Sequence, residues 1–220
     1  NRNENESNSN TRAEDINHNL VNRSTVYNQA IANGKNFNGN VIYRKKFKKE
    51  GRSMSFGLSG SKVENDQESR LISNNYLVAT NMNIDYNQNK YNLTDNNQFG
   101  VQATYSEPLI KNNVFLELNY RYSQNRNESN NRTYDLDANG VETYNDRFSN
   151  HYKFNYDMNR GGMAFRYNKN KINASIGGDM ANTNFEQINY TRSELSRTYS
   201  QQNFFPKATF RYKFNTYSSF

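Results

Sequence analysis

The 220-residue sequence contains no cysteine, no tryptophan, two prolines and only two histidines, His18 and His151. Without cysteine, the chain has neither a disulfide framework nor a thiolate metal site. No run of about 18 apolar residues occurs, so no transmembrane helix is expected. Only 33% of the residues are hydrophobic, too few to fill the core of an ordinary soluble domain of this length.

Aromatic residues and asparagine are abundant instead. The chain holds 17 tyrosines and 14 phenylalanines, and about one residue in five is asparagine, a residue that suits turns. Many aromatic residues in a polar chain require a special architecture. A membrane β-barrel provides one, because its strands turn an apolar face to lipid and a polar face to a wet lumen.

The segment 113–125 (NVFLELNYRYSQN) alternates with period two. One face carries Val114, Leu116, Leu118, Tyr120 and Tyr122, which we expect to face lipid. The other carries Phe115, Glu117, Asn119, Arg121 and Ser123, which we expect to face the lumen. This pattern predicts a membrane-spanning strand.

Alternation elsewhere predicts seven strands in all. They are 40–48, 53–61, 98–106, 113–125, 162–168, 171–185 and 204–214. Short turns join them in hairpins at KEGR (49–52), at PLIK from Pro108, and at Lys169 and Asn170. Long polar stretches lie between the hairpins, and we expect them to be loops: 66–97, 127–160 and 187–202. Short turns on the periplasmic side and long loops outside are typical of outer-membrane barrels.

The domain organisation follows from this pattern. Residues 1–220 are expected to form part of one barrel, with 1–36 as a polar extracellular loop or strand extension and 37–214 as three hairpins plus a seventh strand. The segment 76–86 also alternates and fits either a membrane strand or a loop hairpin. Aromatic residues just before the turns (Phe47, Tyr105 and Tyr167) fit an aromatic girdle on the periplasmic side, and Lys45 points to lipid near a turn.

Seven strands do not make a whole barrel, because single-chain bacterial barrels have even numbers of eight or more. We therefore expect 40–48 and 204–214 to be edges that pair with strands beyond these residues rather than with each other. The chain begins inside a polar stretch and is expected to be a processed or partial sequence. A soluble β-sandwich or β-solenoid, acting as a binding or adhesion module, is the alternative.

The sequence supports no enzyme, cofactor or metal site. The two histidines are isolated, and no nucleophile elbow, phosphate-binding loop or zinc motif occurs. The GLSG at 57–60 reads as small residues on a strand, and Glu107 has no partner carboxylate at a fixed spacing. The DLDANG at 135–140 resembles the start of a calcium loop, but Glu142 and Asp146 break the continuation, which favours an ordinary turn.

The formal net charge is +7. Basic side chains fall on the polar faces of separate strands, which argues against a nucleic-acid patch. They form either a solvated wall with counter-charges from a plug, or a passage that attracts anions. These residues are Arg44, Lys46, Lys48, Arg121, Arg166, Lys207, Arg211 and Lys213.

Four segments carry a family resemblance: RKKFKKEGRSMSFGLSGS (44–61), YSEPL (105–109), NYRYSQNRNES (119–129) and FFPKATFRYKF (204–214). Together they resemble the outer-membrane β-barrel family of Bacteroidota, in the TonB-dependent receptor superfamily. The resemblance implies a 22-strand barrel in the cell outer membrane, with an N-terminal plug and a carboxypeptidase-regulatory-like domain. It also implies transport or surface binding of a solute, with outer-membrane lipid, the plug, the remaining strands, the TonB system and a surface lipoprotein as partners. The residues that bind the solute are not identified by it.

Overall fold

The structure, a computed structural model, describes residues 2–111 and 113–214. These residues form nine strands and two short 3-10 helices, η1 (Val78–Thr80) and η2 (Ser193–Leu195). The strands are β1 (Arg2–Glu14), β2 (Leu20–Lys46), β3 (Ser53–Leu77), β4 (Met82–Ile110), β5 (Val114–Leu136), β6 (Glu142–Tyr144), β7 (Asn150–Lys169), β8 (Ile172–Asn189) and β9 (Arg197–Tyr212).

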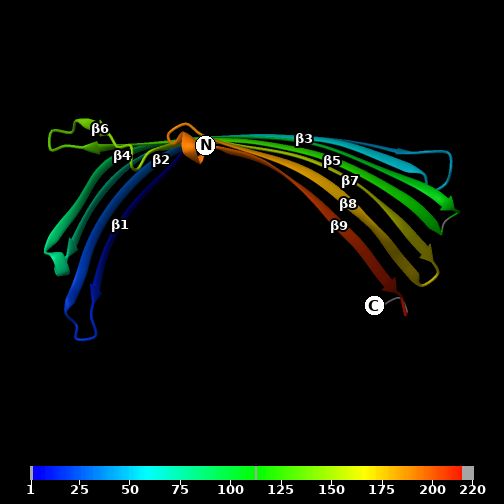
Figure 1. Cartoon of the computed structure of the whole chain (residues 1–220), viewed down its shortest axis with the longest axis horizontal. Helices are drawn as coiled ribbons and strands as arrows, with labels where there is room; N and C mark the ends of the chain where they lie inside the picture. Colours follow the sequence, from blue (N-terminus) through cyan, green and yellow to red (C-terminus); the bar gives the residue numbers. More distant parts are fainter. Residues whose placement is uncertain (1, 112, 215–220) are drawn as a thin grey trace.

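The strands form one antiparallel sheet in the order β1-β2-β3-β4-β5-β7-β8-β9, and β6 pairs with the end of β5. Figure 1 shows this sheet bent into an arch. Within the described residues the sheet is open, because β1 pairs with β2 alone and β9 with β8 alone. The two predicted edges do not pair with each other: residues 35–46 pair with β3, and β9 pairs with β8. The fold is that of a barrel wall.

The three tight turns lie at one end of the sheet, on the right in Figure 1. Phe47 N–H donates to the carbonyl of Arg52 at 3.1 Å across the first turn. In the third turn Asn170 has φ 53°, a left-handed conformation that asparagine tolerates. The predicted start of the second turn at Pro108 is wrong. Pro108 pairs with Phe115 inside β4 beside a register shift, a place where a strand accommodates a missing N–H donor.

The expectation that 66–97, 127–160 and 187–202 are long loops is wrong, because most of these residues lie in strands. Extended strands of 29 residues, as in β4, span about 95 Å, about three times the hydrocarbon thickness. Outside the membrane both faces of the sheet meet water. Polar residues therefore follow one another without alternating with apolar ones, and the sequence pattern resembles that of a loop.

Two further segments are placed by the structure. Residues 76–86 are a hairpin tip: β3 ends at Leu77, η1 makes the turn, and β4 begins at Met82. Residues 2–36 hold β1 and the first part of β2, joined by a five-residue turn at 15–19. The last strand begins at Arg197 rather than at the predicted residue 204, so Pro206 lies in the middle of β9, an edge strand within the described residues, where a missing donor is tolerated.

The register sorts the side chains onto two faces, named here the apolar face and the polar face. On β5 the apolar face carries Val114 to Tyr122 at even positions, and then changes to Gln124 and Arg126. The row across the sheet at Tyr120 reads Tyr43, Phe56, Ala103, Tyr120, Gly161, Met180 and Phe204. The apolar band is thus nine residues high on β5, close to the 9–11 residues that cross a bilayer.

The two faces also differ in exposure. On β8 the apolar-face residue Met180 is 61% exposed, whereas its neighbours Asp179 and Ala181 on the polar face are 2% and 4% exposed. Side chains on the apolar face are therefore exposed, whereas side chains on the polar face pack against one another. This inverts the usual order of a soluble protein and fits a sheet whose outer face contacts lipid.

Candidate functional site

Asp179 organises the polar face near the turn end of the sheet. Its Oδ2 accepts hydrogen bonds from Arg160 Nε at 2.8 Å and from Lys207 Nζ at 2.5 Å, and its Oδ1 accepts one from Asn119 Nδ2 at 3.3 Å. These partners come from β7, β9 and β5, the strands on either side of β8 and one strand beyond. The Arg160 guanidinium also lies 4.5 Å from the centre of the Phe205 ring. The Asp179 cluster (Asn119, Arg160, Asp179 and Lys207) therefore ties four strands together through one carboxylate.

The predicted basic residues divide into paired and unpaired ones. Lys207 is paired with Asp179, and Arg166 lies 3.1 Å from Glu117. Arg44, Arg121 and Arg211 form no ion pair with a described residue. Two positions differ from the prediction: Lys48 lies in the turn after β2, and Lys213 lies one residue beyond β9, where its N–H donates to the carbonyl of Lys171. Lys45 lies on the apolar face, with its amine 5.3 Å from the Phe47 ring.

Glu107, for which the sequence offered no role, anchors the β2–β3 turn to β4. Arg52 Nε and NH2 donate to its two oxygens at 2.7 and 2.8 Å, and Lys49 Nζ donates to Oε1 at 2.7 Å. The Tyr105 hydroxyl donates to Oε2 at 2.5 Å. The YSEPL segment thus supplies both a carboxylate and a hydroxyl to the contact, which is a structural role at the turn end.

Farther from the turns, the polar face loses its charges. Five successive rows of β3, β4 and β5 make up what we name the neutral field, in which every side chain is uncharged. It consists of Ser59, Ser61, Val63, Asn65 and Gln67 on β3; Gly100, Gln98, Asn96, Thr94 and Asn92 on β4; and Ser123, Asn125, Asn127, Ser129 and Asn131 on β5.

The opposite face of the same stretch is rich in charge. Its charged residues are Lys62, Glu64, Asp66, Asp95, Arg126 and Glu128. Charge is thus segregated by face and not by strand. Charged and uncharged side chains therefore alternate along these strands. Because the strands are polar over a long stretch, this alternation is hard to recognise in the sequence alone.

A groove of about 680 Å³ lies over the neutral field, and none of its lining residues is charged. Ser59, Gly100 and Ser123 form one row of its floor, and Gln98 and Asn125 the next. A Cβ at Gly100 would come within 2.7 Å of Ser59 Oγ, so a larger residue here would displace the Ser59 side chain in the floor of the groove. The volume is within the range of small-molecule sites.

An aromatic strip borders the groove on β7, β8 and β9. Tyr156 lines the groove, and its ring centre lies 5.5 Å from that of Phe185. Phe185 in turn stacks on Tyr199, with ring centres 4.8 Å apart and an interplanar angle of 20°. The sequence pattern alone does not indicate this strip. Tyr156 and Phe185 lie in one row only because of the cross-strand register.

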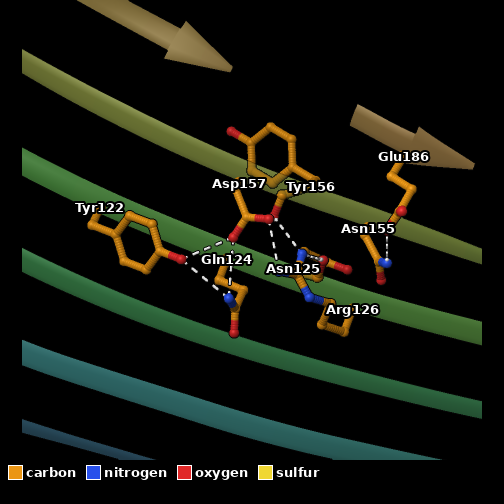
Figure 2. Close-up of polar contacts among 8 residues, drawn as sticks. All are labelled: Tyr122, Gln124, Asn125, Arg126, Asn155, Tyr156, Asp157 and Glu186. Atoms are coloured by element: carbon orange, nitrogen blue, oxygen red, sulfur yellow. Dashed lines mark hydrogen bonds and ion pairs between the residues drawn. The ribbon is translucent and has the colours of Figure 1, made fainter. Parts of the chain in front are cut away.

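The polar groups on the apolar-face side of the same strands bind one another. Figure 2 shows Tyr122, Gln124 and Arg126 of β5 directed at Asp157 of β7, just beyond the apolar band. The Tyr122 hydroxyl donates to Asp157 Oδ1 at 2.8 Å, and Arg126 NH2 lies 2.7 Å from Oδ2. By contrast, the side chains of Gln98 and Asn125 in the groove hold no hydrogen bond to another described residue.

The DLDANG segment at 135–140 forms a turn held by local hydrogen bonds. In the 135–140 segment, Asp137 Oδ1 accepts the N–H groups of Asn139 and Val141, and Gly140 has φ 79°, which is a tight turn. Asp135 accepts hydrogen bonds from Gln88 and Asn145. The described residues contain no group of three or more histidine, aspartate or glutamate side chains able to hold a metal ion.

His151 lies 2.9 Å from Glu128, and His18 lies in the β1–β2 turn, far along the chain from it. The GLSG residues belong to β3. Over residues 2–111 and 113–214, no helix is long and apolar enough to span a membrane.

Comparison with known proteins identifies the chain. No curated protein and no solved structure matches it. The family model described as outer membrane protein beta-barrel family matches residues 45–220, well over half of the chain. Members of such a family are typically not enzymes, and an outer-membrane location excludes the soluble module considered above. The apolar face therefore contacts lipid, the polar face lines the lumen, and the chain belongs to the outer membrane protein beta-barrel family.

Proposed function

We propose that this chain is part of the wall of a transporter like the TonB-dependent receptors, which moves a solute across the outer membrane or binds it at the cell surface. The observation that carries the proposal is the polar face itself. Over a nine-residue membrane band it places Arg121, Arg160 and Asp179 opposite a lipid-facing apolar surface. Charged side chains at membrane depth face water or a protein partner, and they mark solute pathways.

The proposed partners are outer-membrane lipid, further barrel strands, a plug domain, the TonB system and a surface lipoprotein, in a bacterium of the Bacteroidota. Further strands are supported by the edges. Residues 35–46 and β9 each have one neighbouring strand within the described part of the chain. In hydrocarbon an unpaired backbone edge costs several kcal/mol per group, so a closed barrel requires additional strands.

A plug is supported by the unpaired cations of the lumen wall. Arg44, Arg121 and Arg211 have no acidic partner among the described residues, while Arg160 and Lys207 share Asp179. A plug with acidic side chains at this depth would neutralise them. The alternative is a wet passage that attracts anions. Passive diffusion through such a passage needs no energy, whereas TonB-dependent transport does.

Uptake by intact cells tests the proposal. Cells that express the full-length protein and cells that lack it are given radiolabelled solutes, including neutral and charged oligosaccharides and peptides, with and without a protonophore. Energised transport predicts protein-dependent uptake of at least one solute that the protonophore abolishes. Uptake that the protonophore leaves unchanged would show passive diffusion, and would contradict the TonB-dependent proposal.

A further inference from the structure

The geometry points to a neutral, polyhydroxylated solute, an oligosaccharide, as the ligand of the groove over the neutral field. This inference rests on the proposed function, because it names the class of solute that the lumen wall receives. It draws on three independent features of the wall: the absence of charge, the free amide and hydroxyl groups, and the bordering aromatic rings.

The absence of charge is specific to one face. The rows from Ser59–Gly100–Ser123 to Gln67–Asn92–Asn131 carry no charge toward the lumen, whereas the opposite face of these strands carries six charged residues. The composition of the strands therefore permits charge, and only the lumenal side lacks it. An ionised ligand would find no counter-charge among the residues that line this groove, which disfavours its transfer from water.

The polar groups of the groove match hydroxyl groups. The amides of Gln98 and Asn125 each offer two donors and an acceptor, and the hydroxyls of Ser59 and Ser123 donate and accept. A sugar hydroxyl also donates and accepts, so it can satisfy both kinds of partner. The side chains of Gln98 and Asn125 form no hydrogen bond within the described part of the chain, in contrast to the saturated cluster around Asp157 in Figure 2. They are available to a ligand.

The aromatic strip supplies an apolar surface beside these groups. Tyr156 lines the groove, and the rings of Phe185 and Tyr199 continue from it across β8 and β9. A pyranose ring has apolar C–H faces and a polar rim, so a platform of rings next to a field of amides fits it. The groove volume of about 680 Å³ accommodates several sugar units rather than one.

Binding to the purified full-length protein in detergent tests the inference. Isothermal titration with maltohexaose, a neutral hexasaccharide, is compared with titration by hexagalacturonate, an anionic one of the same length. We expect maltohexaose to bind at least tenfold more tightly. Equal or tighter binding of hexagalacturonate would overturn the inference, and so would the absence of binding by both.

Variants locate the ligand. Tyr156→Ala and Gln98→Glu are each expected to weaken maltohexaose binding about tenfold, a change of about 1.4 kcal/mol. Asn155→Ala and Gln202→Glu make the matched changes on the opposite face and should leave the affinity unchanged. Circular dichroism confirms that each variant is folded, and Tyr156→Phe, which keeps the ring, should retain most of the affinity. Equal loss in groove and control variants would place the sugar elsewhere.

The binding and uptake experiments fail separately. Titration needs no energy source, so maltohexaose binding without protonophore-sensitive uptake would uphold the ligand class and reject the transport mechanism. Energised uptake restricted to charged solutes would uphold the transport mechanism and reject the neutral ligand class.

Discussion

Arg52 donates hydrogen bonds to both carboxylate oxygens of Glu107, with Nε–Oε2 and NH2–Oε1 distances of 2.7 and 2.8 Å. The two residues are 55 positions apart in sequence, in the β2–β3 turn and near the end of β4. A two-point contact between a planar guanidinium and a carboxylate fixes orientation as well as distance. It therefore sets the position of one turn relative to the next hairpin.

Glu107→Gln should destabilise the folded full-length protein, because Arg52 and Lys49 lose the negative charge and one of the two acceptor oxygens of their shared carboxylate. The measurement is the urea midpoint of unfolding from lipid vesicles. Lys111→Gln is the control, since Lys111 and Glu50 are 3.8 Å apart and both largely exposed. A Glu107→Gln midpoint no lower than that of the control would contradict the anchoring role.

Asp179→Asn should cost about 3 kcal/mol of unfolding free energy, because it keeps the shape but leaves Arg160 and Lys207 without their carboxylate. Adding Lys207→Gln should recover part of the loss. Asp66→Asn, at an exposed position on the opposite face, serves as the control. If Lys207→Gln instead deepened the loss of unfolding free energy, repulsion between Arg160 and Lys207 would not be its cause.

Gly51→Ala should be more harmful than Gly140→Ala. Both glycines have positive φ, 82° and 79°, so alanine costs about 1–2 kcal/mol at either site. At Gly51 a Cβ would also approach Phe115 Cε1 to 2.7 Å, whereas nothing lies within 4 Å of one at Gly140. Parallel urea titrations measure the difference. Equal losses would mean that the Phe115 ring moves aside freely.

Spin labels test the two faces. Single cysteines at Val114, Leu116 and Leu118 should report high accessibility to oxygen, which concentrates in lipid. Labels at Glu117, Asn119 and Arg121 should report accessibility to a water-soluble nickel reagent. The assignment of the faces would be overturned if both sets of labels gave the same ratio.

Asp15 provides a pH-dependent contact in the β1–β2 turn. Hydrogen bonds from the Asn19 side chain and backbone lower the pKa of Asp15 below its ordinary value. Because the folded pKa is depressed, the stabilisation is present above the unfolded pKa and disappears as the pH falls through the folded one. Asn19→Ala should raise the pKa of Asp15, measured from its carboxyl carbon shift by NMR. An unchanged pKa would contradict the role of Asn19.

The sequence by itself determined the membrane band and its two faces. In that band one side meets lipid and the other meets water, so period-two alternation in segments such as 113–125 records the environment directly. The positions of the tight turns near residues 50 and 170 follow from the ends of this alternation, whereas the turn predicted at Pro108 begins only after Ile110. The family resemblance rests on the same segments.

Only the tertiary structure decided how far the strands continue and which side chains meet. Beyond the bilayer both faces of the sheet are wet, so residues such as 66–76 show no regular alternation of polar and apolar positions and resemble a loop. The Asp179 cluster and the neutral field depend on the cross-strand register, which joins Asp179 to Lys207 and sets Gln98 beside Asn125. Register arises from pairing along whole strands, and no local pattern in the sequence encodes it.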